Sequence, residues 1–376
     1  MEQELAGNEG GPHPGVGRHR GRLARAPSGR ASPESGGGAA AVHRALRLTR
    51  RLLSPGVPGK LRVMKPFVLL PVVAVLLGPL TALAAEEFEI KSSGEFRKVI
   101  AADAKLEKLA DGFAFTEGPV WVAAEGGYLV FSDIPRNQLK KWTRAGGVTT
   151  FREPSQNANG NTLDREGRLV TAEHSGRRVS ITDAGGLVQT LVSKVDGKRF
   201  SSPNDVVVKS DGTVWFTDPT YGLPKGATKE TDGNHVYRYD LKARRAVVVA
   251  REFDMPNGLC FSPDEKRLYV ADSGKPRHIR VFEVRADGTL DEGRVFAAIE
   301  KGGPDGIRCD ADGRVWSSSG SGADIFLPSG RLIGKVNVPK GAANLCFGGA
   351  DGKTLFLTAR DALWALPTQV TGAARP

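Results

Sequence analysis

Hydrophobic and polar positions follow a pattern that repeats along most of the chain. The stretch from Ser201 to Pro219 holds two runs of β-branched and aromatic residues on either side of an Asp-Gly pair. Two such runs around Asp-Gly are typical of a β-hairpin. Aligned on this turn, equivalent stretches open on an oxygen-bearing side chain at six positions, which we call the column: Glu117, Asn159, Asn204, Asn257, Asp305 and Asn344.

The spacing of the column predicts the fold. Its members are separated by 42, 45, 53, 48 and 39 residues. A period of about 40–50 residues with four short strands in each unit is typical of the blades of a β-propeller. Helical repeats of similar length would carry an apolar residue every three or four positions. We therefore predict an all-β fold, a six-bladed β-propeller; a hairpin-rich sandwich with turns repeated by chance is the alternative.

The two ends of the propeller should meet in one blade. We expect a strand from the N-terminal part to join the blade made by the C-terminal part, so that the ring closes with short protected edges. The segments near Phe88–Ile90 and Phe113–Phe115 are the candidates for this strand. Residues 361–366 are predicted to form the last strand, and residues 368–376 a tail.

The sequence divides into three regions. Residues 1–63 are rich in Gly, Ala, Pro, Ser and Arg, so we expect them to be disordered. Residues 64–85 read as a signal peptide, because Met64-Lys65 precedes an apolar run that ends in Ala82-Leu83-Ala84. We infer that Met64 is the true start, that residues 1–63 come from an over-extended reading frame, and that residues 86–376 form the propeller.

A signal peptide predicts a periplasmic or secreted protein, without stable membrane contact after the peptide is cleaved. A membrane anchor is the alternative, since the apolar run from Phe67 to Ala84 is near the minimum length for a span. Of the formal net charge of +11, residues 1–85 account for +8. The basic character therefore belongs to the leader, and we expect no nucleic-acid binding by the propeller.

Three cysteines are placed by the same repeat. Cys260, Cys309 and Cys346 each follow a column residue by two to four positions, which puts them on the innermost strands of three blades. We expect buried thiols that act as small hydrophobic residues. A disulfide between two of them is the alternative. No Cys-X-X-Cys or Cys/His spacing indicates zinc.

The column has a chemistry of its own. Equivalent positions at the start of innermost strands converge on the central channel of a propeller, at the end that we call the mouth. Two carboxylates and four carboxamides there would form a ring of oxygen atoms, which suits Ca²⁺ or Mg²⁺ better than zinc or copper. The alternative is that Asn and Asp begin strands as turn residues. Two carboxylates at one channel, however, require a cation or a proton.

Residues at the end of each second strand should return to the mouth. Asp218 begins the loop Asp-Pro-Thr-Tyr-Gly, which can overhang the channel with Tyr221. His174 precedes a turn that carries Arg177, a side chain able to meet hydroxyl groups or a carboxylate. We predict that these four residues contact substrate; a turn aspartate, a packed tyrosine and a solvated hairpin tip are the alternatives.

Several motifs resemble those of the SMP-30/gluconolactonase/LRE family. They are TEGPVW, SPNDVVV, WFTDPTYG, MPNGLCFS and GPDGIRCDADGRVW, and they span about Leu109 to Leu366. The resemblance implies a six-bladed propeller with one divalent cation in its channel, most commonly Ca²⁺, with Mg²⁺, Mn²⁺ and Zn²⁺ as alternatives. It implies that Glu117, Asn257 and Asp305 bind the metal, and that Asn204 binds metal or substrate. Animal sugar lactonases of the family carry an Arg where this chain has Ser202, so substrate recognition must differ from theirs.

The predicted activity is metal-dependent hydrolysis of a sugar lactone such as glucono-1,5-lactone. A cation polarises the carbonyl and activates water, and Asp305 is the predicted general base. No Gly-X-Ser-X-Gly motif indicates a nucleophilic serine. The alternatives are hydrolysis of another ester or of an organophosphate at the same site, and a non-catalytic propeller that binds a partner. We expect a small-molecule lactone as the only ligand besides the metal, and a monomer or weak dimer.

Overall fold

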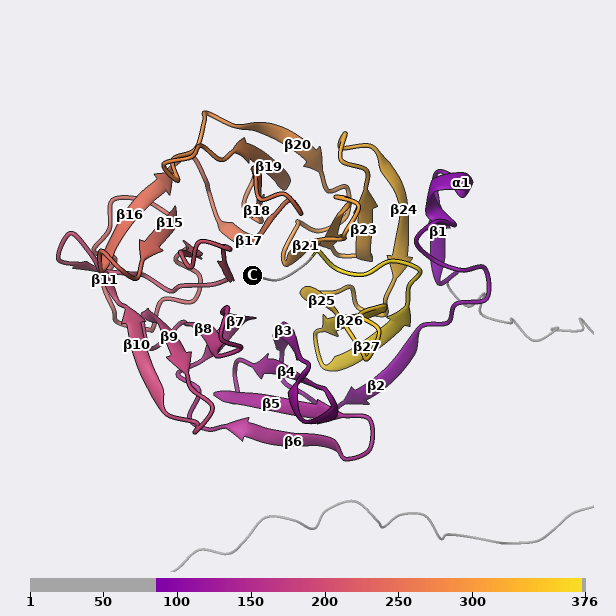
Figure 1. Cartoon of the computed structure of the whole chain (residues 1–376), viewed down its shortest axis with the longest axis horizontal. Helices are drawn as coiled ribbons and strands as arrows, with labels where there is room; N and C mark the ends of the chain where they lie inside the picture. Colours follow the sequence, from indigo (N-terminus) through magenta and orange to yellow (C-terminus); the bar gives the residue numbers. More distant parts are fainter. Residues whose placement is uncertain (1–85, 374–376) are drawn as a thin grey trace, which may run out of the picture. The chain divides into compact units, whose positions relative to one another are not determined.

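Six sheets are arranged around a central channel in the computed structural model, which describes residues 86–373 (Figure 1). The sheets follow one another in chain order, and four strands of each run antiparallel from the channel outward. The predicted six-bladed all-β propeller is therefore confirmed. The predictions for residues 1–63 and 64–85 lie outside the described residues.

The strands of each blade are short and consecutive. The first two blades hold β3 (Thr116–Val122), β4 (Tyr128–Asp133), β5 (Gln138–Thr143), β6 (Gly147–Arg152), β7 (Ala158–Leu163), β8 (Leu169–Glu173), β9 (Arg178–Thr182) and β10 (Val188–Val192). The next two hold β13 (Val206–Val208), β14 (Val214–Asp218), β15 (His235–Asp240), β16 (Arg245–Ala250), β17 (Pro256–Phe261), β18 (Arg267–Asp272), β19 (His278–Glu283) and β20 (Arg294–Ala298). The last two hold β21 (Ile307–Cys309), β22 (Val315–Ser318), β23 (Gly322–Phe326), β24 (Leu332–Asn337), β25 (Asn344–Gly348), β26 (Thr354–Ala359) and β27 (Ala362–Pro367).

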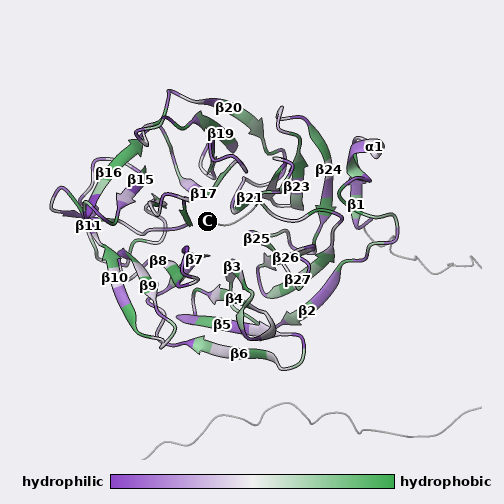
Figure 2. Ribbon diagram, in the orientation of Figure 1, coloured by the Kyte–Doolittle hydropathy of each residue, from purple (hydrophilic) through white to green (hydrophobic). Residues whose placement is uncertain are grey.

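The closing strand differs from both predicted candidates. It is β2 (Glu107–Asp111), which pairs antiparallel with β27 and completes the sixth blade. The segment β1 (Phe88–Ile90) is a strand, but it pairs with β24 as a fifth strand of the fifth blade. Residues 113–115 form no strand. Figure 2 shows β2 as mainly hydrophilic, so no apolar pattern in the sequence marks it as a strand.

The remaining elements are small. A two-stranded ribbon, β11 (Lys194–Val195) and β12 (Lys198–Arg199), leads into the third blade. Helix α1 (Ser93–Phe96) and the 3-10 turn η1 (Ala124–Gly126) have four and three residues. Within residues 86–373, no helix is long and apolar enough to cross a membrane.

Aromatic contacts between neighbouring blades form much of the core. The Trp215 ring packs edge-on against Phe261 of the next blade, with centroids 5.4 Å apart. The Trp316 ring does the same against Phe347, at 5.3 Å. Such pairs contribute about 0.5–1.5 kcal/mol beyond the burial of their surface. The blades are thus held together by side chains from their innermost and second strands.

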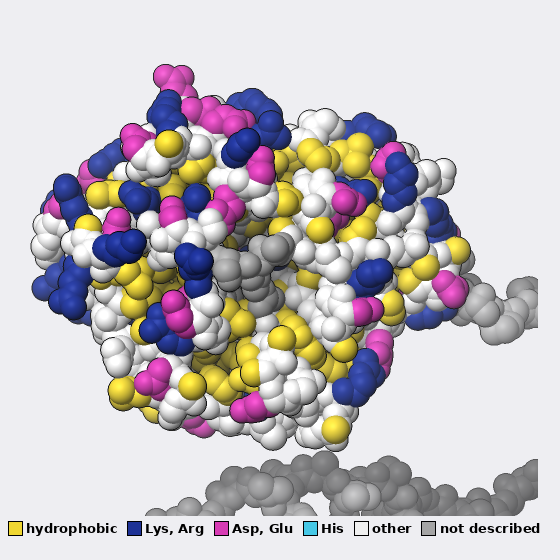
Figure 3. Space-filling model, viewed as in Figure 1, with side chains coloured by type: hydrophobic (Ala, Val, Ile, Leu, Met, Phe, Trp, Pro, Cys, Tyr) yellow, Lys and Arg dark blue, Asp and Glu magenta, His cyan; other side chains and the backbone are white. Residues whose placement is uncertain are grey.

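The C-terminal tail packs on the face opposite the mouth. The Ala311 N–H donates to the Thr371 carbonyl at 2.9 Å, and Asp310 pairs with Gly372 in an isolated bridge. Figure 3 shows this face of the molecule, with Lys and Arg side chains interspersed with Asp and Glu around the rim. The tail therefore helps to close the channel at the end away from the column.

Candidate active site

The structure brings the six column residues together at the mouth. Five are 5% exposed or less, and Asp305 is half-buried. Three hydrogen bonds join neighbours around the ring: Gly160 N–H to the Asn204 carbonyl (2.8 Å), Gly258 N–H to the Asp305 carbonyl (3.0 Å), and Asn344 Nδ2 to Glu117 Oε2 (2.9 Å). The ring that the repeat predicted is therefore a connected structure.

A recurrent irregularity turns the column residues toward the channel. In three blades, the pairing of the innermost strand with its neighbour shifts beside the column residue. A β-bulge bends the strand locally and changes the direction of the side chains around it. The shifts lie between Glu117 and Val120, between Ala158 and Asn161, and between Pro256 and Leu259.

Glycine after a column residue allows the strands to approach. A Cβ on Gly118, at φ +47°, would lie 1.9 Å from the Asn159 carbonyl oxygen. A Cβ on Gly306 would lie 2.0 Å from the Asn344 side chain. Neither contact is physically acceptable, so a larger residue would push the ring apart. The Glu-Gly and Asp-Gly pairs in the motifs therefore have a packing reason.

Neighbouring carboxylates disfavour the ionisation of Glu117 and of Asp305. Burial, followed by the charge of Asp305, raises the pKa of Glu117 well above its usual range. Burial, followed by the charge of Asp205, raises the pKa of Asp305 to about 7, although a hydrogen bond from Asn257 opposes the shift. Like charges in a poorly solvated channel disfavour ionisation. A cation between them would relieve this repulsion.

Asp205 and Arg308 form an ion pair in the channel. Neither residue was predicted from the sequence to belong to the site. Burial raises the pKa of Asp205, and the Arg308 guanidinium opposes this with an ion pair at 3.4 Å. Asp205 directly follows a column residue, and Arg308 interrupts an otherwise apolar strand. A charged residue between Ile307 and Cys309 is itself a signal of a buried partner.

The donor set fits a hard divalent cation. The three channel carboxylates, Glu117, Asp205 and Asp305, outnumber the two guanidinium groups that act on them, those of Arg308 and Arg360, so the channel keeps a net negative charge that a cation would neutralise. The Asn159 Oδ1 atom is a buried acceptor without a hydrogen-bond partner, and oxygen atoms of this kind are what Ca²⁺ and Mg²⁺ prefer. In residues 86–373 no three His, Cys, Asp or Glu side chains could hold a metal ion by themselves. A cation here would therefore depend on carboxamide oxygens as well.

The carboxamides differ in how far they are already engaged. Asn344 donates to Glu117, and its Oδ1 accepts from the Leu345 N–H at 2.8 Å. Asn257 Nδ2 donates to Ser273 Oγ at 2.9 Å, so its oxygen is left to serve as a ligand. Asn344 thus orients a carboxylate, whereas Asn257 fits the ligand role that the family resemblance implies.

His174 lies behind the ring as a neutral side chain. Its Nε2 atom is 3.1 Å from Asn159 Nδ2, and burial lowers its pKa to about 4. A Cβ on Gly222 would lie 2.5 Å from the imidazole, so the loop after β14 packs directly on it. His174 therefore positions Asn159 and this loop at neutral pH, and a contact with substrate stays a prediction.

Tyr221 is held over the mouth by the same loop. Its ring packs edge-on against His174 with centroids 6.5 Å apart. Desolvation, and then the charges of Asp305 and Glu117, raise the pKa of Tyr221 well above its usual range. The residue is 46% exposed. Tyr221 is thus placed to meet a molecule bound at the ring.

Asp218 and Arg177 hold backbone segments beside the site. The buried Asp218 carboxylate accepts from the Ser201 and Ser202 N–H groups at 2.8 and 2.7 Å. Burial raises the pKa of Asp218 to about 7, although these two bonds oppose the shift. The Arg177 guanidinium donates to the Phe200 and Thr228 carbonyls and pairs with Glu230. Their predicted substrate contacts stay predictions, and the observed bonds favour a positioning role.

The fold and the oxygen-lined channel define a class of propeller enzyme, and sequence comparison identifies the family. Residues 115–361 match the model of the SMP-30/Gluconolactonase/LRE-like region. The chain belongs to this family. It is 32% identical over 310 residues to a gluconolactonase of Zymomonas mobilis, covering 75% of this chain and 86% of that protein. It is 30% identical over 251 residues to a 6-deoxy-6-sulfogluconolactonase of Pseudomonas putida, covering 64% and 82%.

Solved structures agree with this assignment. A gluconolactonase from Xanthomonas campestris superposes with a TM-score of 0.71 at 37% identity. The match covers 75% of this chain and 95% of that one. The part of the chain that folds as the propeller is thus the part that its relatives share.

Proposed function

We propose that the protein hydrolyses a sugar lactone, of the glucono-1,5-lactone type, at the column ring with the help of one divalent cation. The protein is a lactone hydrolase: relatives that cover most of its propeller are named as gluconolactonases and as a sulfogluconolactonase. The observation that carries the proposal is the convergence of Glu117, Asn204, Asn257 and Asp305 at one mouth. Ca²⁺ is the cation that the donor set favours.

The ring residues can supply the groups that lactone hydrolysis needs. A divalent cation held by these four side chains would supply a Lewis acid for the lactone carbonyl. Asp305 accepts a proton from the water whose oxygen adds to the carbonyl carbon. The ring C–O bond then breaks, and that proton passes to the departing ring oxygen. The product is an open-chain hydroxy acid, so water is consumed and nothing is oxidised.

The surrounding residues bind and orient the substrate in this proposal. Asn204, a member of the ring, and Tyr221, on the loop beside it, would hydrogen-bond to sugar hydroxyls. His174 and Arg177 keep the Tyr221 loop in place through the contacts described above. Asp218 fixes the segment that leads to Asn204.

Acid release from glucono-1,5-lactone, followed with a pH indicator and corrected for spontaneous hydrolysis, tests the proposal. We expect turnover that a chelator abolishes and that added Ca²⁺ or Mn²⁺ restores. Turnover that a chelator leaves unchanged would contradict metal dependence. Activity on an aryl ester or an organophosphate but on no lactone would favour the alternative hydrolase, and no turnover at all would favour a binding module. Relatives named as lactonases favour the lactone hydrolase over both alternatives.

We further propose that the protein works outside the cytoplasm. The proposal rests on the pattern of residues 64–85, a basic start followed by an apolar run and Ala-Leu-Ala. Protein isolated from its host should begin near Ala85. N-terminal sequencing that finds residues before Met64 would contradict the start site, and an intact Met64 terminus would indicate an anchor.

A further inference from the structure

A small cavity of about 170 Å³ adjoins the ring on the side of the fifth and sixth blades. Asp305 forms one wall, and Phe115, Lys340 and Arg360 lie on the others. These residues come from loops that precede β3, β21 and β25 and from the turn between β26 and β27. All of these loops lie at the mouth, so the cavity is open to a molecule bound at the ring.

The floor of the cavity carries almost no side chains. Gly302, Gly303, Gly320, Ala342 and Ala343 line it. Gly302 has φ +76°, and a Cβ there would lie 2.9 Å from the Gly320 nitrogen. The loops therefore pack backbone against backbone, which leaves space beside Asp305 for part of a ligand.

The two cationic side chains on the cavity wall, Lys340 and Arg360, differ in their partners. Lys340 Nζ lies 2.6 Å from Asp361 Oδ2, so its charge is already compensated. Arg360 is exposed, and its guanidinium lies over the Phe115 ring at 5.5 Å. Within residues 86–373 that guanidinium forms no ion pair or hydrogen bond. Its charge opposes the upward pKa shift of Asp305, so Arg360 is an exposed cation, held by an aromatic face, whose field reaches the ring.

We propose that Arg360 binds an anionic substituent of the lactone, and that the physiological substrate is a sugar lactone carrying a carboxylate, sulfonate or phosphate group. The proposal rests on the proposed lactone hydrolysis and names the substrate class for the same site. A planar guanidinium matches the oxygen pairs of all three groups and can bind them with two parallel hydrogen bonds. With a neutral sugar this charge would act on Asp305 alone. Arg360 is then a specificity-determining residue on the wall of the cavity beside Asp305.

The test compares a neutral and a charged substrate. kcat and KM are measured for glucono-1,5-lactone, for 6-phosphoglucono-1,5-lactone and for glucaro-1,4-lactone, with wild-type protein, Arg360→Gln and Arg360→Lys. We expect wild-type kcat/KM to be at least tenfold higher for one charged lactone than for the neutral one. Arg360→Gln should lower this ratio about 30-fold, mainly through KM, because one charge-assisted pair is lost. Arg360→Lys should recover part of the ratio.

Controls separate this inference from the proposed function. Lys353→Gln, an exposed change at the β25–β26 turn, should leave the ratio within twofold of wild type. A wild-type enzyme that shows no preference, or an Arg360→Gln variant that loses equally on all lactones, would overturn the inference while leaving lactone hydrolysis intact. An effect of Arg360→Gln confined to inhibition by gluconate would also overturn it, since the guanidinium would then bind the product carboxylate. Failure to hydrolyse any lactone would overturn the proposed function itself.

Discussion

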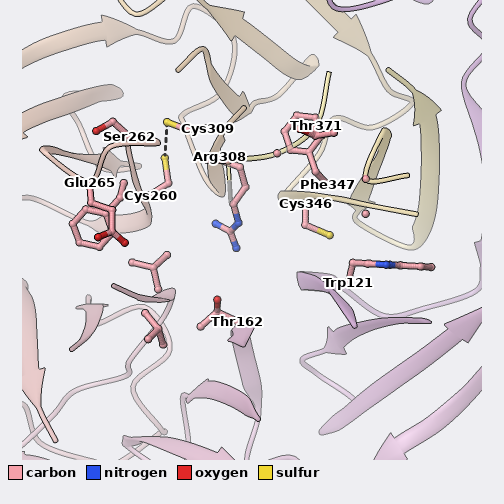
Figure 4. A pocket seen from close by; sticks show the side chains of 17 residues that line it. Trp121, Thr162, Cys260, Ser262, Glu265, Arg308, Cys309, Cys346, Phe347 and Thr371 are labelled. Atoms are coloured by element: carbon pink, nitrogen blue, oxygen red, sulfur yellow. Dashed lines mark hydrogen bonds between the residues drawn. The ribbon is translucent and has the colours of Figure 1, made fainter. Parts of the chain in front are cut away.

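The two ends of the central channel are built from the same six strands but differ in chemistry. At the mouth the strands present carboxylates and carboxamides. Two to four residues further along, three of them present Cys260, Cys309 and Cys346, beside Trp121 and Phe347. Figure 4 shows this second end, where the sulfur atoms of Cys260 and Cys309 face each other at 3.7 Å. The start of each innermost strand thus holds polar residues of the candidate active site, and its continuation holds residues that pack in the interior.

The opposite end is a cavity of about 250 Å³ partly covered by the chain's own tail. Thr371, Gly372 and Ala373 line it, and the Ala373 N–H donates to the Cys309 carbonyl at 2.9 Å. The three cysteines are buried, as predicted, and form no disulfide within residues 86–373. Arg308 lies between the two ends and points into the channel (Figure 4). Its ion pair with Asp205 links the polar mouth to the apolar end.

The largest effect should come from Asp305→Asn at the mouth. This change keeps the size of the side chain and an oxygen ligand, so the propeller should fold, but the general base is lost. We expect a fall in kcat of about 10³-fold that saturating Ca²⁺ or Mn²⁺ does not restore. The measurement is the lactonase rate against metal concentration.

Asn204→Asp is the matched variant for this prediction. It keeps an oxygen ligand and leaves Asp305 in place, so it should retain metal and measurable turnover. If Asp305→Asn instead recovers a near-wild-type rate at high metal, Asp305 is a ligand only. The base would then have to be sought elsewhere in the mouth, beginning with Asp218.

Arg308 lies between the two ends of the channel. Arg308→Met should cause the largest loss in the free energy of unfolding. The substitution leaves the Asp205 carboxylate, whose side chain is 2% exposed, without its partner. Removing one member of a buried pair costs about 3–5 kcal/mol, so we expect a loss of about 3 kcal/mol in denaturant unfolding. The double variant Arg308→Met/Asp205→Asn should recover at least 1 kcal/mol. A double variant as unstable as the single one would show that the pair is not coupled.

His174 should make the mouth sensitive to acid. Its pKa is about 4 in the folded protein against an ordinary value of 6.5. Between these values only the unfolded chain holds the extra proton, so stability is lost as the pH falls through that window. From pH 7.5 to 5 the loss from His174 is about 2 kcal/mol.

Unfolding of wild-type protein and of His174→Gln, compared at pH 7.5 and pH 5, isolates this contribution. The comparison is needed because Asp218, with a pKa raised to about 7, acts in the opposite direction and gains stability as the pH falls. His174→Gln should be less acid-sensitive than wild type. An equal acid sensitivity of the two proteins would mean that His174 is not buried as a neutral group.

The smallest effect should come from the apolar end. Cys309→Ala removes one buried sulfur and should lower stability by about 1 kcal/mol. Because no cysteine lies in the ring, kcat/KM should stay within twofold of wild type. A loss of more than tenfold in rate would show that the two ends are coupled more strongly than their separation in chemistry indicates.

The same contrast explains what the sequence could predict. The column was visible because it repeats with a fixed offset from a turn, and the family motifs then implied which members bind metal. β2 was not visible, because Glu107–Asp111 is an outermost strand with one partner and little apolar pattern. The bonds of Arg177 and Asp218 could not be predicted either, since they depend on loops that only the folded chain brings near.

Asp205 and the unpaired oxygen of Asn159 show a further limit. Both are adjacent to or within the column, yet their roles follow from burial and from the Arg308 and His174 contacts. The Asp205–Arg308 pair joins the third and fifth blades, and Asn159 and His174 lie 15 residues apart within the second blade. Neither contact leaves a local pattern in the sequence. The sequence therefore predicts which positions carry functional side chains. The structure shows which of these side chains already have hydrogen-bond or ion-pair partners.

Equilibrium binding of Ca²⁺ to the metal-free protein, measured by titration calorimetry, tests the central claim most directly. We expect one ion per chain, with affinity reduced at least tenfold in Glu117→Gln and unchanged in Asp351→Asn, an exposed turn residue. Lactonase activity should rise in parallel with occupancy. A protein that binds no ion, or that binds it equally well after Glu117→Gln, would contradict the account of the column ring as the metal-dependent active site.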